Sequence, residues 1–120
     1  GSKKRPFHIK VRGSDYFAMA GIYDVWRRDG KDLVTCSILT TQANDVLSEV
    51  HDRMSVILDR SAESSWLTKE VLSEDVLRSM LIPYPSRDVE MYPVSDLVND
   101  SKVDDPQMIV PYRLQQTKLF

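Results

Sequence analysis

The pair Asp29-Gly30, which separates two segments rich in apolar residues, constrains the fold more than any other feature of the sequence. An Asp-Gly pair in this setting is typical of a tight β-hairpin, because the turn needs residues that accept a positive φ. The flanking segments 16–26 and 33–41 are therefore expected to be antiparallel strands. Residues 6–12 alternate apolar and polar side chains with the period of a half-buried strand. Together, the three segments predict an antiparallel β-meander.

The second half of the sequence predicts short helices. Ser61 and Ser73 are candidate N-caps, the first for a segment that carries Trp66 and Leu67 and the second for one that ends before Pro83. Proline ends a helix because it lacks a backbone N–H and clashes with the preceding turn. Shorter elements are expected at four further places: a helix over 44–50 capped by Asn44 or Asp45, a buried strand at 56–58, a strand at 89–92 and a helical turn over 95–99 capped by Ser95. The fold class that follows is α+β, in a single domain, since 120 residues suit one core.

The net charge of -2 argues against a protein that binds nucleic acid through bulk positive charge, because affinity for phosphates grows with the number of neutralising Lys and Arg residues. Lys and Arg are nevertheless crowded into the first quarter of the chain. This basic quarter either faces a polyanion or is a solvated hairpin edge, and the charges alone favour the solvated edge.

The single cysteine, Cys36, excludes an internal disulfide and a cysteine-based zinc site, and it suits a reducing compartment. It shares a strand face with Val34 and Ile38, so we expect a small core residue with an inert thiol. Neither His8 nor His51 has a second ligand at metal-binding spacing, so neither a metal nor another cofactor is expected. No apolar run approaches the roughly 18 residues of a membrane span. The expected location is cytoplasmic.

The run His51-Asp52-Arg53-Met54 is the strongest candidate for chemistry, since it places an imidazole, a carboxylate and a guanidinium side by side between residues expected to be buried. A histidine at the end of a short helix can act as an acid, a base or a phosphate contact. In the structural alternative, the imidazole only bonds a nearby carbonyl while Asp52 and Arg53 form an internal ion pair. Thr40, at a strand end, either binds phosphate or caps the next helix.

Three other candidates have simpler interpretations. Asp24, near the basic pair at 27–28, is expected to form a surface ion pair rather than to act as a base. His8 is expected to point to solvent from the first strand. A buried Cys36 would be a poor nucleophile, which counts against a hydrolase built from His51 and Cys36.

Several segments, in order along the chain, resemble the SOS response-associated peptidase (SRAP) family, whose members process abasic sites in single-stranded DNA. The matching segments are RPFHI at 5–9, AGIYDVW at 20–26, SILTTQAN at 37–44, HDRM at 51–54, VIL at 56–58 with WL at 66–67, and YPVS at 92–95 with VN at 98–99. The most specific of these is the HDRM motif before an apolar triplet. Ser55 departs from the family, which usually has proline there.

The resemblance implies a fold and a mechanism. The strands would belong to an SRAP-type open barrel, and a cysteine at the mature N-terminus would attack the aldehyde of the abasic sugar, forming a covalent DNA–protein crosslink in the response to DNA damage. The family name also implies a peptidase, and hence a hydrolase. Of the residues that assist this reaction, the chain has the histidine, as His51; Arg53 and Thr40 would contact the DNA backbone.

The resemblance also sets the expected boundaries. Residues 1–2 look like a tag remnant, and residues 3–120 like the C-terminal portion of one SRAP domain, without the nucleophilic cysteine. We therefore expect a piece that does not crosslink DNA alone, needs the N-terminal half of the domain as its partner, self-associates in isolation, and works in the cytoplasm near a bacterial nucleoid. The alternative is a non-enzymatic partial domain that acts as a DNA-binding or protein-interaction module.

Overall fold

The computed structural model describes residues 4–113, so the predicted tag remnant at residues 1–2 lies outside the described residues. The strands are β1 (Phe7–Val11), β2 (Ala18–Met19), β3 (Gly21–Arg28), β4 (Lys31–Ile38), β5 (Thr40–Gln42), β6 (Arg53–Ser55), β7 (Ile57–Leu58) and β8 (Val89–Pro93). The helices are α1 (Arg60–Trp66) and α2 (Glu74–Met80), with 3-10 turns η1 (Leu47–Glu49), η2 (Ser86–Asp88), η3 (Asp96–Asn99) and η4 (Pro106–Ile109). The α+β class is confirmed.

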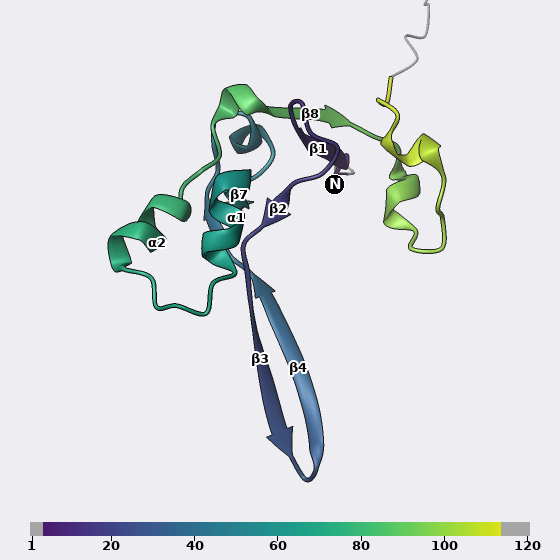
Figure 1. Cartoon of the computed structure of the whole chain (residues 1–120). Coiled ribbons are helices and arrows are strands. Elements are labelled where there is room, and N and C mark those ends of the chain that lie inside the picture. Colours follow the sequence, from purple (N-terminus) through teal and green to yellow (C-terminus); the bar gives the residue numbers. More distant parts are fainter. Residues whose placement is uncertain (1–3, 114–120) are drawn as a thin grey trace, which may run out of the picture.

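The strands pair antiparallel in four couples: β1 with β8, β2 with β7, β3 with β4, and β5 with β6. The hairpin expected around Asp29-Gly30 is confirmed as β3–β4, and both turn residues have positive φ, 53° and 75°. It extends away from the other elements as an arm (Figure 1). The arm makes the molecule long: its radius of gyration is 18.5 Å, whereas about 14 Å is usual for a compact domain of this size.

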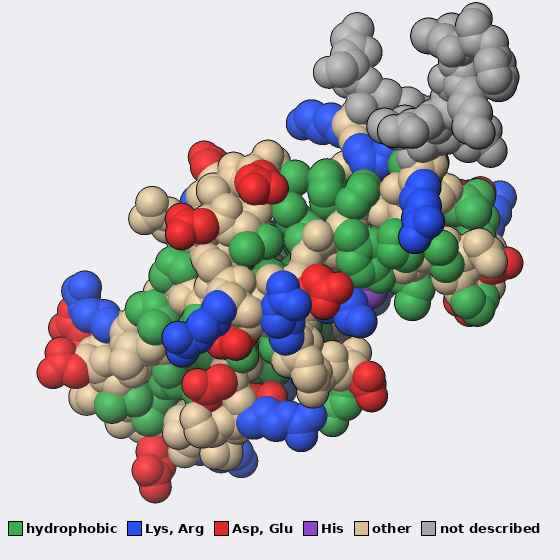
Figure 2. All heavy atoms as spheres, turned by 90° about the horizontal axis from the view of Figure 1, so that it is seen from above, with side chains coloured by type: hydrophobic (Ala, Val, Ile, Leu, Met, Phe, Trp, Pro, Cys, Tyr) green, Lys and Arg blue, Asp and Glu red, His purple; other side chains and the backbone are tan. Residues whose placement is uncertain are grey.

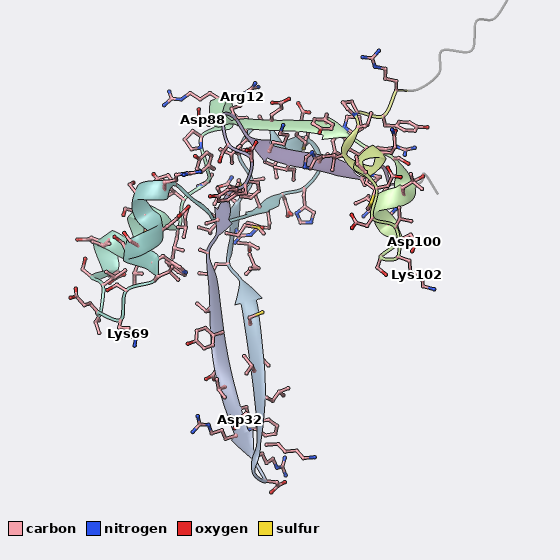
Figure 3. All side chains as sticks on the ribbon, turned by 45° about the vertical axis from the view of Figure 1, so that its right-hand side comes forward. Arg12, Asp32, Lys69, Asp88, Asp100 and Lys102 are labelled. Atoms are coloured by element: carbon pink, nitrogen blue, oxygen red, sulfur yellow. The ribbon has the colours of Figure 1, made fainter. Side chains whose placement is uncertain are left out.

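The first strand of the expected meander takes a different partner. β1 pairs with β8 from the far end of the chain, and Arg12 N donates to Asp88 O (2.8 Å) where the pair ends (Figure 3). The expected central strand over 16–26 is divided at Ala20, with β2 pairing to β7 and β3 to β4. The reason is burial: pairing with β8 brings Val11 against Val89 in a shared apolar cluster, a gain that no local pattern reveals.

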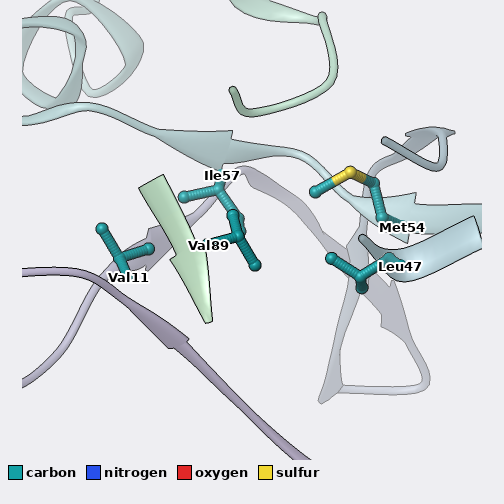
Figure 4. Close-up of a cluster of buried hydrophobic side chains, with 5 residues drawn as sticks. All are labelled: Val11, Leu47, Met54, Ile57 and Val89. Carbon is teal, nitrogen blue, oxygen red and sulfur yellow. The ribbon is translucent and has the colours of Figure 1, made fainter. Parts of the chain in front are cut away.

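Two apolar clusters form the core. The first contains Val11, Leu47, Met54, Ile57 and Val89 (Figure 4), and the second contains Ala20, Val56, Leu58 and Met80. Three backbone hydrogen bonds tie the crossing segments together: Ala20 N donates to Val56 O, Leu39 N to Ala20 O, and Val56 N to Leu39 O, all at 2.8–2.9 Å. This crossing joins both strands of the arm to the segment that leaves β6.

The helix caps follow the local sequence with one exception. Ser73 caps α2 and Ser95 caps η3, as expected. The prediction that Ser61 caps the first helix is wrong, because Asp59 takes that position and accepts from Ala62 N at 3.0 Å. The Ser61 hydroxyl donates to the same carboxylate at 2.6 Å, and the two bonds lower the pKa of Asp59. A carboxylate is also well placed at the positive end of the helix dipole.

The arm changes the environment of several side chains. Cys36, expected in the core, is exposed, because no second layer within residues 4–113 covers β4. Its register partner Tyr23 is 77% exposed. The expectation that His8 is solvated is also wrong, since it is half-buried and bonded to Tyr92. No helix in the described part of the chain is long and apolar enough to cross a membrane.

Candidate functional site

The structure brings two of the predicted site residues together across β5 and β6. Arg53 Nη2 donates to the backbone oxygen of Thr40 at 2.9 Å and to its hydroxyl oxygen at 3.1 Å. Thr40 therefore binds the arginine instead of capping the next helix, and the ion pair between Asp52 and Arg53 considered from the sequence is not formed. Both contacts come from Nη2, and the guanidinium has further donors on Nη1 and Nε. The guanidinium is thus held at a strand end with donors to spare.

His51 lies two residues before Arg53, just after the turn η1, as the sequence predicted. Its backbone N–H donates to Leu47 O at 2.9 Å. Its ring nitrogen Nδ1 accepts from the backbone N–H of Arg53 at 3.0 Å and lies 3.1 Å from a carboxylate oxygen of Asp52. The side chain of His51 is 69% exposed. Of the flanking residues expected to be buried, Met54 is buried but Val50 is exposed.

The strand β6 positions the site through its alternation of faces. Met54 points into the first apolar cluster, so its neighbour Arg53 points away from that cluster. Asn44 holds the other side: its Oδ1 accepts from Leu47 N at 2.9 Å, and its Nδ2 donates to Tyr84 O at 2.8 Å. This buried asparagine joins the turn before His51 to the segment after α2. The sequence did not predict the contact between Asn44 and Tyr84, because it indicated Asn44 only as a cap of the following turn.

The other candidate residues lie apart from this site. Cys36 is in the middle of β4 on the arm, whereas the His51 ring contacts Arg53 and Asp52. The carboxylate of Asp24 accepts from the N–H of the next residue at 2.8 Å. The expected ion pair of Asp24 is not formed, because Arg27 pairs with Asp32 and Arg28 with Asp29.

The face of the molecule seen in Figure 2 is mixed in charge. Figure 2 shows Lys and Arg side chains interspersed with Asp and Glu side chains over the upper face of the molecule. A cavity of about 310 Å³ lies between α1 and the segment 82–85, and its lining does not include His51, Arg53 or Thr40. Among residues 4–113 no group of three His, Cys, Asp or Glu side chains could hold a metal ion. The arrangement can offer an imidazole and a fixed guanidinium to an anionic ligand on an open surface.

Comparisons with known proteins give a consistent picture. A family model described as SOS response associated peptidase (SRAP) matches residues 1–101. The abasic site processing protein YoqW of Bacillus subtilis (strain 168) is 43% identical over 107 residues, covering 88% of this chain and 48% of YoqW. The abasic site processing protein HMCES of Mus musculus is 36% identical over 96 residues, covering 78% of this chain and 26% of HMCES.

A solved structure agrees with these relatives. The crystal structure of a protein from Bacteroides thetaiotaomicron superposes with a TM-score of 0.83 and is 31% identical, covering 94% of this chain and 50% of that protein. The chain spans about half the length of the bacterial relatives it matches. The long arm, with its exposed apolar faces, is therefore part of a fold that a much longer solved chain also contains.

Proposed function

The chain belongs to the SRAP family, and from this premise we propose that it forms the part of a site around His51 that processes abasic sites in single-stranded DNA. The proposed location is the cytoplasm, near the nucleoid. The observation that carries the proposal is the pair of hydrogen bonds between Arg53 and Thr40 beside His51. A guanidinium already held in one orientation loses little side-chain entropy when a phosphate binds to its remaining donors.

In the proposed mechanism, the nucleophile is a cysteine supplied by the part of the family domain outside this chain. Its α-amine attacks the aldehyde carbon of the opened sugar, one water leaves, and an imine forms. Its thiol then adds to the imine carbon and closes a thiazolidine, so the sequence loses one water and needs no oxidant or reductant. His51 assists where the sugar ring opens, while Arg53 and Thr40 hold the backbone of the strand.

The arm is the proposed contact surface for the remaining half of the domain. An isolated two-stranded hairpin is only marginally stable in water, and this one exposes Tyr23, Trp26 and Val34. The match covers only 50% of the solved chain, which supports a further part of the domain of about the size of this chain. Without such a layer, the exposed apolar faces are expected to cause self-association.

The test is adduct formation with a single-stranded oligonucleotide that carries one abasic site. This chain alone should give no adduct that survives denaturation. A chimera in which this chain replaces the matched half of YoqW should give one, and His51→Ala in that chimera should slow it by about 100-fold, within the range for a lost acid–base group.

Two outcomes would contradict the proposal. One is an adduct formed by the chain alone. The other is a chimera that unfolds cooperatively, like YoqW, but forms no adduct where YoqW does. If both the chain and the chimera bind the oligonucleotide without forming an adduct, the result favours the alternative of a non-enzymatic DNA-binding module.

A further inference from the structure

We propose that Asn44 and Ser86 are positioning residues for His51: together they fasten the loop 43–52, which carries His51, to the segment 84–86. That the loop is fastened at these points concerns this chain alone. That the fastening affects the rate of the reaction rests on the proposed function. Both residues act through the backbone of the loop and not on the DNA.

The loop 43–52 is closed and connects β5 to β6. Ala43 N donates to Asp52 O at 3.0 Å across its ends, and the turn η1 lies between them. Leu47 links Asn44 to His51 within this loop. Its N–H donates to Asn44 Oδ1 at 2.9 Å, and its carbonyl accepts from His51 N at 2.9 Å. The backbone of His51 is therefore placed by the same residue that Asn44 holds.

The contacts of Asn44 require an amide side chain. Its Oδ1 accepts from Leu47 N, while its Nδ2 donates to Tyr84 O at 2.8 Å. A peptide N–H can only donate and a carbonyl can only accept, so these two partners fix the orientation of the amide. Serine or an ionised aspartate would satisfy the turn equally well, but neither has a second atom that can donate. The bond to Tyr84 is therefore what an amide adds at this position.

The segment that receives the loop is stiff. Tyr84 lies between Pro83 and Pro85, and a proline restricts both its own φ and the backbone of the residue before it. The hydroxyl oxygen of Ser86 accepts from the backbone N–H of Asp45 at 3.1 Å, which makes a second tie. The same segment leads into β8, whose first residue lies in the first apolar cluster. The loop is thus fastened at two neighbouring points to backbone that the core holds.

The proposed DNA contact does not depend on these ties. Arg53 and Thr40 are bonded to each other across β5 and β6, which pair outside the loop. A shift of the loop therefore displaces His51 and leaves the guanidinium in place. A displacement of about 1 Å can cost about 100-fold in rate, because the reacting groups need close, aligned contact. The ties are expected to act on the rate of the reaction with bound DNA and not on the affinity.

Amide hydrogen exchange of this chain tests the fastening, with the buried Val56 as the reference for the core. The exchange rate of the His51 amide relative to that of Val56 should rise by about 10-fold in Asn44→Ala and by about 3-fold in Ser86→Ala. Ser86→Ala removes a half-buried hydroxyl and leaves the core filled, so it gives the answer even if Asn44→Ala does not fold. Asn99→Ala is the matched control, because it removes the same atoms from an exposed asparagine and should leave the ratio unchanged.

The chimera with YoqW tests the effect on the reaction. At a saturating concentration of the abasic oligonucleotide, Asn44→Ala should slow adduct formation by about 10-fold and Ser86→Ala by about 3-fold, with unchanged affinity for the oligonucleotide. Adding Asn44→Ala to His51→Ala should give no further loss of rate, because the side chain that is positioned has already been removed.

Three results would count against these expectations. An unchanged exchange ratio in both Asn44→Ala and Ser86→Ala would overturn the fastening. A loss of rate that multiplies with the loss in His51→Ala, or an equal loss of affinity, would assign Asn44 to the general stability of the domain and overturn the positioning role. If the chimera forms no adduct, or His51→Ala does not slow it, the proposed function fails, and the exchange rates of the chain alone decide whether Asn44 and Ser86 fasten the loop.

Discussion

Val56 is the position where a single substitution tests the packing that carries the site. It is fully buried, with 0% of its surface exposed, and its backbone bonds to both Ala20 and Leu39 at the crossing of three segments. It also directly follows β6, which holds Arg53. Val56→Ala keeps these backbone bonds and removes only apolar side-chain volume. Any loss of stability therefore measures the packing at the crossing.

The magnitude follows from the burial. Valine has about two more buried carbon groups than alanine, and each contributes about 0.8 kcal/mol, which gives about 1.6 kcal/mol. The space left behind adds about 0.5–1 kcal/mol, because the neighbours relax only in part. The free energy of unfolding should therefore fall by about 2–2.5 kcal/mol, a large share of the 5–15 kcal/mol typical of whole domains. For this chain length the melting temperature should drop by about 8–10 °C.

Urea unfolding followed by tryptophan fluorescence measures this difference, provided that the slope of the transition is unchanged. Val71→Ala is the matched control, since Val71 is fully exposed between the helices and the same atoms are removed. It should change the free energy of unfolding by less than about 0.5 kcal/mol. The reasoning is refuted if Val56→Ala costs no more than Val71→Ala, because the crossing would then be unpacked in the isolated chain.

Three further predictions concern the site, a helix cap and the arm. Arg53→Ala should weaken binding of single-stranded DNA and reduce the slope of log affinity against log salt by about 0.7, whereas Arg53→Lys should lower the affinity with little change in slope. Fluorescence anisotropy at several salt concentrations measures both quantities. An unchanged slope in Arg53→Ala would contradict the contact between Arg53 and the DNA. Asp59→Ala should cost about 1 kcal/mol through the lost cap. Because hydrogen bonds from Ser61 and Ala62 lower the folded pKa of Asp59 below 3.8, this contribution is complete at neutral pH and disappears as the pH falls below that value; equal losses in urea unfolding at neutral and strongly acidic pH would contradict it. Cys36 should react with a thiol reagent in the folded chain as fast as an exposed cysteine and become protected when the arm is covered in the chimera, so equal labelling of chain and chimera counts against the proposed contact surface.

Much of the local structure could be predicted because its causes are local. The Asp29-Gly30 turn, the Ser73 cap and the Ser95 cap depend on residues within a few positions of one another. The displacement of the α1 cap from Ser61 to Asp59 is a small failure of the same kind, since two candidate caps stand two residues apart. Ser61 and Asp59 both make hydrogen bonds within the first turn of α1, so only the geometry decides which of them is the cap.

The candidate site could be predicted in composition but not in its contacts. The sequence indicates His51, Arg53 and Thr40 through their motif and strand-end position. It left open whether Arg53 pairs with Asp52, and the structure shows it bound to Thr40 instead, across two strands. Contacts between residues 13 positions apart depend on how β5 and β6 align, which follows from the burial of Met54 and not from the motif.

The sequence was sufficient to predict the α+β class, the hairpin and most caps, because turn chemistry, capping and side-chain alternation act over a few residues. The site residues that it indicates stay a prediction. The pairing of β1 with β8, the exposure of Cys36 on an arm and the binding of Arg53 to Thr40 came from the tertiary structure alone. These features depend on which distant segments meet, and that choice is made by the apolar surface buried over the whole chain.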